Sequence, residues 1–351
     1  MHMADALISP AVGATLWAVS GGLIAGGARR VRRSPRDDLA PMMGVLGAFV
    51  FAAQMINFSI PGTGSSGHLG GGLILAILLG PYAAFLAIAS VLTVQAFFFA
   101  DGGLLALGCN IFNLGFFPAF IGYPLVYRAI TRDQPGTPRA WVAAVVAAVV
   151  SLQLGAFSVV LETRASGVSA LPFGTFVLLM LPIHLAIGVV EGLATAAVVA
   201  FVARARPAAR PAAQTAGATA GPRAVLVGLL IAAGVVGGAV SWFASTRPDG
   251  LEWCLAKVTG KEDVAGSETG VHADLAALQA QTAFLPGYGF QSAAVESAAA
   301  RQPAPAPEPW PAVNAGTSLS GLVGGLMTLG VACLAGFALK ARLPRRAQGN
   351  G

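Results

Sequence analysis

Long apolar runs separated by short polar segments constrain this chain more than any other feature. Between Leu39 and Tyr127 the only charged side chain is Asp101. A helix needs about 20 apolar residues to cross the roughly 30 Å hydrocarbon core of a bilayer, and runs of this kind recur along the sequence. With 56% hydrophobic and 10% charged residues, the chain is predicted to be an all-α protein that crosses a membrane several times.

The apolar segments can be counted, with one ambiguity. Residues 69–100 are too many for one ordinary crossing, and Gly80-Pro81-Tyr82 interrupts them, where a helix stops or bends. Short loops rich in Lys and Arg stay on the cytoplasmic side, and such loops follow the first and the fourth segments. An even number of crossings must therefore separate these loops, so residues 69–100 are predicted to form a hairpin. The segments are residues 8–27, 42–58, 69–100, 104–127, 141–161, 172–202, 224–244 and 319–339, which gives nine helices.

The same rule sets the orientation. Most of the 21 Lys and Arg residues fall on the inner side, which predicts an extracytoplasmic N-terminus and a cytoplasmic C-terminus in a bacterial inner (cell) membrane. The net charge of +6 then reflects orientation in the lipid bilayer, and no nucleic-acid partner is expected. The start lacks the basic region and cleavage site of a secretory signal. We therefore expect Met1 to be the mature first residue.

Two modules are expected. A seven-helix membrane module covers residues 1–204, a cytoplasmic Ala/Pro-rich linker covers residues 205–223, and a two-helix module covers residues 224–346. The second module carries an outward loop, residues 245–316, which ends in a Pro-rich stretch. We expect one or two short helices in this loop and little core.

Two histidines fall on the predicted outer side. His2 is the second residue, and His68 lies in the glycine-rich loop SIPGTGSSGHLGGG. The terminal amine, the amide of residue 2 and the His2 imidazole can close a five-membered and a six-membered chelate ring, and His68 can fill the remaining position in the plane. Four nitrogens in a plane suit Ni(II) or Cu(II) and disfavour zinc, and cobalt can also bind them. The alternative is two solvated polar residues at the membrane interface.

Four motifs point to a known family. MHMADALISP, FAAQMINFSIPGTGSSGHLGGG, FADGGLLALGCNIFNLG and HLAIGVVEG together resemble the CbiM/NikM family, the substrate-binding membrane components of energy-coupling-factor (ECF) cobalt and nickel importers. The resemblance implies metal ligands at Met1, His2 and His68, and an N-terminus delivered into the protein centre by an additional first helix. The family's usual start resembles MHIPDG, and the Pro-Asp-Gly turn is absent here.

The second module extends the resemblance. STRPDGLEW, directly after a helix, is similar to the small two-helix N component (CbiN/NikN-like) that accompanies the M protein in these systems. The resemblance also implies partners, which are separate ATPase subunits and a coupling transmembrane (T) component. This chain has no GxxxxGK[ST] phosphate loop, so we expect it to bind no ATP.

Other polar residues in apolar surroundings are candidates for support of the site. Asp101 is either a loop residue that caps the next helix or a group that orients a metal-bound histidine. Two pairs spaced by three residues, Asn110 with Asn113 and Gln54 with Asn57, favour hydrogen bonds between helices. His184 and Glu191 are expected on one helix face as a structural polar pair. His272 is given no role. The outward acids either concentrate cations or are merely solvated; they are Asp249, Glu252, Glu262, Asp263, Glu268 and Asp274.

The function expected is therefore capture of Ni(II) or Co(II) on the outer face as the transported substrate of an ATP-driven importer. A cobalt-specific component that feeds cobalamin synthesis is the alternative within this class. An intramembrane metalloenzyme and a stand-alone metal permease are alternatives of other classes. No HExxH motif or paired catalytic carboxylates support an enzyme, so we expect no enzyme activity.

Overall fold

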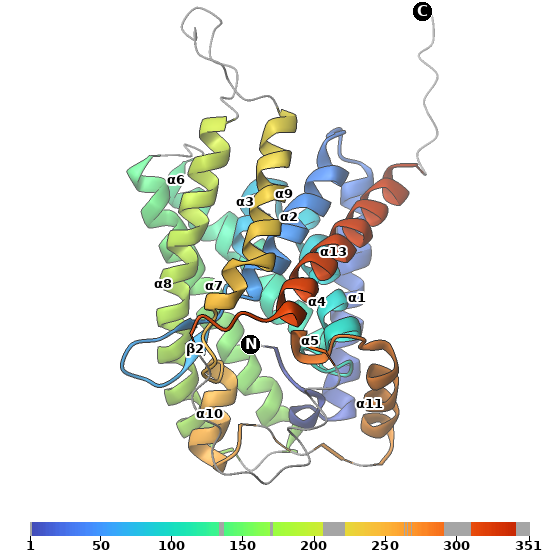
Figure 1. Cartoon of the computed structure of the whole chain (residues 1–351), viewed down its shortest axis with the longest axis vertical. Helices are drawn as coiled ribbons and strands as arrows, with labels where there is room; N and C mark the ends of the chain where they lie inside the picture. Colours follow the sequence, from blue (N-terminus) through green and yellow to red (C-terminus); the bar gives the residue numbers. More distant parts are fainter. Residues whose placement is uncertain are drawn as a thin grey trace, which may run out of the picture.

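The structure, a computed structural model, is built almost entirely of helices (Figure 1). It describes residues 2–132, 137–168, 171–205, 222–262, 264, 266–267, 269–290 and 310–341. The apolar helices are α1 (Pro10–Arg32), α2 (Leu39–Gln54), α3 (Gly72–Leu79), α4 (Pro81–Phe99), α5 (Leu107–Ile111) with the π-helix η2 (Phe112–Tyr127) and α6 (Arg128–Thr131), α7 (Pro138–Ser166), α8 (Phe173–Ala205), α9 (Pro222–Gly238) and α13 (Ala315–Ala341). These helices follow the predicted apolar segments closely.

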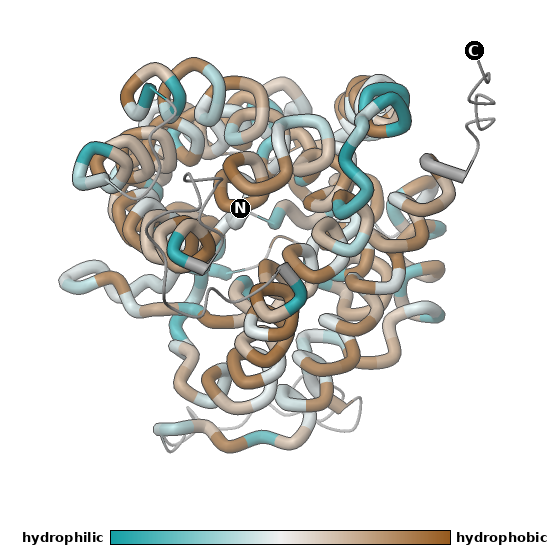
Figure 2. The backbone as a smooth tube through the Cα atoms, turned by 90° about the horizontal axis from the view of Figure 1, so that it is seen from above, coloured by the Kyte–Doolittle hydropathy of each residue, from teal (hydrophilic) through white to brown (hydrophobic). Residues whose placement is uncertain are grey.

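Six helices in the described part of the chain are long and apolar enough to cross a membrane. The helices α2 and α9 are shorter apolar helices, and α3 has 8 residues. Figure 2 shows hydrophobic residues over most of the helical tube, with hydrophilic stretches mainly in loops and at helix ends. The prediction of an all-α, multi-pass membrane protein is confirmed.

Residues 69–100 fold back on themselves at Gly80. This glycine has a φ of 84°, a conformation that favours glycine, and Pro81 begins α4. The turn lies beside the end of α1, where the Arg30 guanidinium sits 5.6 Å from the centre of the Tyr82 ring. At their other ends, α3 begins just after the His68 loop and α4 ends just before Asp101. The predicted turn at Gly80 is confirmed, but α3 has only eight residues, about 12 Å at 1.5 Å per residue, so two crossings by this segment and the count of nine helices stay predictions.

The basic loops share one end of the molecule. The connection from α1 to α2, the α6–α7 region and the C-terminal ends of α8 and α13 lie at the top of Figure 1. The short strands β1 (Phe58–Ser59) and β2 (Ser66–Gly67), together with α10 (Gly250–Thr259) and α11 (Val271–Thr282), lie at the opposite end. This arrangement matches the expected even number of crossings between basic loops; which end faces the cytoplasm stays a prediction.

The second module packs into the same bundle. Helix α13 crosses α2 so closely that a Cβ atom at Gly44 would lie 2.2 Å from the Cys333 Sγ atom and 2.8 Å from the Leu329 carbonyl oxygen. Small residues permit such crossings in membranes, where close van der Waals packing holds helices together. The linker between the modules, residues 206–221, lies outside the described residues, so the division into modules stays a prediction.

The outward loop contains the expected short helices, α10 and α11, with the single turns η3 (Val240–Phe243) and η4 (Pro286–Tyr288) beside them. The expectation of little core needs a correction. Leu251, Cys254 and Leu255 are 0–4% exposed, and they join the hydrophobic core of the first module. The loop is therefore ordered by contact with the first module. Its Pro-rich end, residues 291–309, lies outside the described residues.

Candidate metal centre

The N-terminal segment is buried at the end of the bundle that carries β1, β2, α10 and α11. Met3 is 0% exposed, and its backbone N–H donates to the Asn110 Oδ1 atom at 2.8 Å. The Met3 carbonyl accepts from the Asn110 Nδ2 atom at 3.2 Å and from the Gly103 N–H at 2.9 Å. These bonds fix the backbone on one side of His2. Met1, the other expected ligand residue, lies outside the described residues.

A single helical turn and a hydrogen bond to Asp5 position the N-terminal segment in place of the missing Pro-Asp-Gly turn. Residues Asp5–Leu7 form the single turn η1, and the Asp5 Oδ1 atom accepts the Ala106 N–H at 2.9 Å. Ser9 then caps α1 and Pro10 begins it. The cap prediction for Asp101 is wrong, because Ala106 occupies the N-cap of α5 and the carboxylate that reaches it belongs to Asp5.

A buried carboxylate, that of Glu191, holds the His68 loop in place. The two oxygens of Glu191 on α8 accept the N–H groups of Gly70 at 2.8 Å and Gly71 at 3.1 Å. Gln54 donates to the Gly70 carbonyl at 2.8 Å and accepts from Gln95 at 2.8 Å. Glu191 is 3% exposed, so these hydrogen bonds are shielded from water. The loop is thereby fixed immediately after His68.

The structure brings the two candidate histidines together. The rings of His2 and His68 are stacked, with centroids 4.9 Å apart and an interplanar angle of 7°. Burial and the neighbouring His2 lower the pKa of His68 to about 4. His68 is therefore a neutral imidazole at pH 7, the form that binds metal ions. The contact of the two rings is a finding; their role as ligands stays a prediction.

Asp101 contacts His2 directly. The Asp101 Oδ1 atom lies 3.2 Å from the His2 Nδ1 atom, and the Tyr288 hydroxyl donates to Oδ2 at 2.5 Å. Burial alone would raise the pKa of Asp101, but the charge of His2 and the hydrogen bonds from His2 and Tyr288 hold it well below its usual value. Asp101 is thus an anchored carboxylate beside the candidate ligand.

Chelation of an ion by His2 requires the contact between His2 and Asp101 to break. A six-membered ring through the His2 amide contains the ion, the amide nitrogen, Cα, Cβ, Cγ and Nδ1, so Nδ1 must be the ligand atom. That atom now faces Asp101, and the buried Nε2 atom has no hydrogen-bond partner in the described part of the chain. Within the same residues, no group of three or more His, Cys, Asp and Glu side chains is arranged to hold a metal ion.

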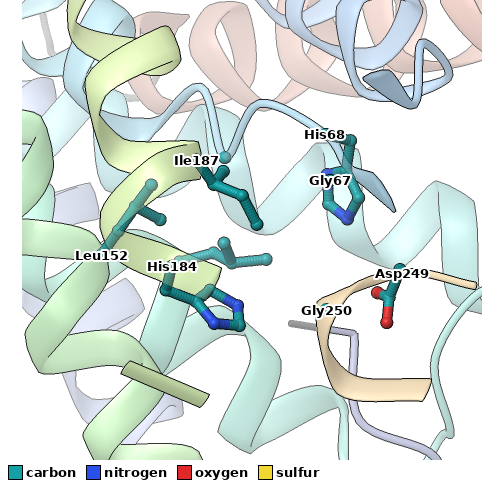
Figure 3. Close-up of a pocket in the computed structure, with 9 residues that line it drawn as sticks. Gly67, His68, Leu152, His184, Ile187, Asp249 and Gly250 are labelled. Carbon is teal, nitrogen blue, oxygen red and sulfur yellow. The ribbon is translucent and has the colours of Figure 1, made fainter. Parts of the chain in front are cut away.

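His184 lies where the sequence did not predict it. Its Nδ1 atom bonds to the Met180 carbonyl of its own helix at 2.8 Å, and Nε2 has no described partner. The ring lines a small pocket together with His68 and Asp249 (Figure 3). The expected pair with Glu191 is therefore divided, because Glu191 grips the His68 loop while His184 faces a pocket.

The residues of the other two predicted pairs, Asn110 with Asn113 and Gln54 with Asn57, also act separately. Asn113 donates to the Glu162 Oε2 atom on α7 at 2.8 Å, which agrees with a bond between helices, whereas Asn110 holds Met3. Helix α2 ends at Gln54, so Asn57 lies beyond it and the two residues share no helix face. The buried Glu162 was missed, because the sequence gives no sign of which residue faces Asn113. His272 bonds to the Ile8 carbonyl through Nε2 at 2.9 Å.

The second module grips the His68 loop from outside. The Trp253 Nε1 atom donates to the Thr63 carbonyl at 3.0 Å, the Ser66 N–H donates to the Pro248 carbonyl at 2.8 Å, and the Ser66 hydroxyl donates to the Arg247 carbonyl at 2.7 Å. Gly250 lies against His184, where an added Cβ would meet its Cε1 atom at 3.2 Å. The PDGLEW stretch thus closes over the loop, a contact that the sequence did not predict.

Comparison with known proteins agrees with this arrangement. Residues 2–209 match the CbiM family, described as the cobalt uptake substrate-specific transmembrane region, and residues 223–341 match the PDGLE domain. A crystal structure of a truncated transition metal transporter aligns with a TM-score of 0.51 and 28% sequence identity, covering 57% of this chain and 98% of that one.

Two relatives illustrate the sequence similarity. A putative metal transport protein of Haloquadratum walsbyi is 37% identical over 209 residues, which are 59% of this chain and 92% of the relative. The probable fused nickel transport protein LarMN of Lactiplantibacillus plantarum is 31% identical over 274 residues, which are 73% of this chain and 81% of the relative.

Proposed function

The chain belongs to the CbiM family of cobalt-uptake transmembrane proteins and is a multi-pass cobalt/nickel transport component; from that premise we propose that it captures the ion on the outer face for ATP-driven import. The observation that carries this proposal is the buried contact of His2 with His68. Two imidazoles at one end of the bundle provide the nitrogen donors that nickel and cobalt accept.

The proposed ligand set has four nitrogens. They are the Met1 amine, the His2 amide, the His2 Nδ1 atom and one ring nitrogen of His68. The loop contacts of Glu191 and the backbone contacts of Asn110 preorganise two of these groups. His2 must exchange Asp101 for the ion, after which the carboxylate remains close enough to offset part of the ion's charge.

Nickel is the first candidate ion and cobalt the second. A planar set that includes a deprotonated amide favours Ni(II), and relatives from three organisms are named fused nickel transport proteins. A cobalt-specific component that supplies cobalamin synthesis is the alternative, since other relatives are named cobalt transport protein CbiM. Competition between the two ions, followed by the visible absorption of the loaded protein, separates these alternatives.

The energy for transport is proposed to come from other subunits. The sequence has no Walker-type phosphate loop, so separate ATPase subunits and a coupling transmembrane component would act on this chain. The family is a metal transport component and not an enzyme, which removes the metalloenzyme alternative. A permease that acts alone is the remaining competitor.

Uptake of radioactive nickel by cells tests this proposal. Cells that express this chain with candidate ATPase and coupling subunits should accumulate nickel, and cells in which the ATPase is inactivated should not. Equal uptake without the partners would show a stand-alone permease. Nickel bound by the purified chain without any partner would still support the capture site.

A further inference from the structure

A second, larger cavity lies beside the histidine pair, at the boundary of the two modules. It has a volume of about 270 Å³, far above the roughly 10–15 Å³ that one water molecule needs. Its wall contains carboxylates from the first module, Asp5 and Asp101, and carboxylates from the second, Asp249, Glu252 and Glu262. The described residues that line it include no Lys or Arg. We call this cavity the acidic chamber.

Four of the five carboxylates of the acidic chamber are held in place. Asp249 caps α10 by accepting the N–H groups of Leu251 at 2.7 Å and Glu252 at 2.9 Å, and Glu252 accepts the Asp249 N–H at 2.8 Å. This capping box fixes two carboxylates at the chamber wall. Asp101 is anchored by Tyr288, and Asp5 by the Ala106 N–H. The charges are therefore fixed, which strengthens the negative field in the cavity.

An unsatisfied histidine forms part of the same wall. The His2 side chain is 8% exposed and lines the acidic chamber, and its Nε2 atom has no hydrogen-bond partner in the described residues. A buried polar atom without a partner is costly and requires a reason. Because the Nε2 atom is itself buried, an ion that has lost part of its water shell on the way from the chamber would supply the missing partner.

Asp249 joins the acidic chamber to the histidines. It lines both the chamber and the small pocket between His68 and His184, which has room for about one water molecule (Figure 3). A wide cavity with five carboxylates in its wall therefore adjoins a narrow pocket that contains two imidazole rings among apolar side chains. Oxygen ligands suit hydrated divalent ions of many kinds, whereas imidazole selects nickel, cobalt and similar metals.

We propose that the acidic chamber is an outer binding site, where carboxylates of both modules hold a hydrated divalent cation before it loses water and passes to the histidines. This inference rests on the proposed function, because the ion that passes on is the transported one. The chamber should bind divalent cations weakly and with little selectivity, and it should mainly raise the rate at which the ion is captured. The second module then contributes half of a site that neither module holds by itself.

Stopped-flow measurement of Ni²⁺ association with the full chain in nanodiscs of neutral lipid tests the proposal. Glu262 and Glu252 are exposed, and Gln keeps the hydrogen-bonding oxygen at Glu252. The combined variant E252Q/E262Q should bind Ni²⁺ about tenfold more slowly, with a weaker dependence on ionic strength and an unchanged dissociation rate. The matched control D274N removes one exposed charge from α11, outside the chamber, and should stay within about twofold of wild type.

Mn²⁺ alone, followed by electron paramagnetic resonance, probes the chamber without the histidine site. His68→Ala leaves the chamber lining intact, so this variant should still bind Mn²⁺ weakly and lose the signal when E252Q/E262Q is added. No Mn²⁺ binding by His68→Ala, an unchanged association rate in E252Q/E262Q, or an equal loss in D274N would overturn the proposal. A wild-type chain that binds Mn²⁺ but never Ni²⁺ would instead refute the proposed function.

Discussion

The two sides of the candidate metal centre are built differently. On the inner side, buried groups of the first module hold the His68 loop, with Glu191 gripping two backbone N–H groups and Gln54 a carbonyl. On the outer side, exposed or half-buried groups of the second module cover the same loop, among them Trp253 and Ser245. Interactions buried in low dielectric are stronger than those at a surface. The inner side should therefore set affinity, and the outer side should set the rate of capture.

Loss of a nitrogen ligand should have the largest effect. His68→Ala removes one of the four proposed donors, and because the remaining three cannot close the plane, nickel affinity should fall by at least about 100-fold, or roughly 2.7 kcal/mol. Isothermal titration calorimetry on the purified chain measures this change. His2→Ala should behave in the same way. An affinity within threefold of wild type in either variant would remove that histidine from the site.

Loss of the Glu191 contacts to the His68 loop should have the second largest effect on nickel affinity. Glu191→Ala leaves the N–H groups of Gly70 and Gly71 without their acceptor, and the His68 loop should lose its fixed position. Removal of such supporting partners typically lowers metal affinity by about 10–100-fold. The matched variant Glu191→Gln keeps one acceptor oxygen and should lie between wild type and Glu191→Ala. Equal affinities in all three proteins would show that the loop needs no buried anchor.

Asp101→Asn should have a smaller effect. Asp101 remains ionised at pH 7 because its pKa lies well below the usual value, so the substitution removes a fixed negative charge beside His2. Nickel affinity should fall by about tenfold. Tyr288→Phe removes the hydrogen bond to Asp101 but keeps the charge, so it should change affinity less than Asp101→Asn. The reverse order would assign the effect to the hydrogen bond instead.

Proton release on binding distinguishes the proposed ligands from a simple histidine pair. Burial lowers the pKa of His68 to about 4, so this imidazole has already lost its proton at pH 7. A histidine is neutral above its pKa, so His68 contributes no proton when the ion binds. The amide, the amine and the His2 Nδ1 atom must each give up any proton that they carry, so at least about one proton, that of the amide, should be released per ion. Calorimetry in buffers of different ionisation enthalpy counts them, and release of none would exclude the amide as a ligand.

His272→Ala should have the smallest effect of all. His272 makes one partly buried hydrogen bond, to the Ile8 carbonyl, and is not among the residues that contact the histidine pair. Nickel affinity should stay within about twofold, since a single hydrogen bond of this kind contributes only about 1 kcal/mol to stability and His272 is not a proposed ligand. A larger loss, measured by the same calorimetry, would mean that the second module also positions the N-terminus through α11.

The sequence predicted what depends on local pattern and charge. Helix positions follow from apolar runs, and the break at Gly80-Pro81 together with the arginine clusters predicted the hairpin. The proximity of His2 and His68 followed from placing both on one side of the membrane. None of this required knowledge of how side chains pack.

The remaining features depend on contacts that no periodicity encodes. Glu191 and Gly70 are separated by 121 positions, and Asn110 and Met3 by 107. A glutamate in an apolar helix signals that it needs a partner, but not that the partner is the backbone of a distant loop. The packing of α10 on the first module was missed for the same reason, because the acidic surface of that segment indicated solvation.

The terminal amine provides the most direct test of the central claim. A Gly-Ser-Gly-Ser extension ahead of Met1 keeps every side chain but converts the amine to an amide. An extension of several residues is needed, because one added residue would place His2 third and create a new planar chelate. The account predicts that nickel affinity, measured by calorimetry, falls at least about 100-fold while the circular dichroism and the melting temperature stay unchanged. Wild-type affinity in the extended protein would contradict the account.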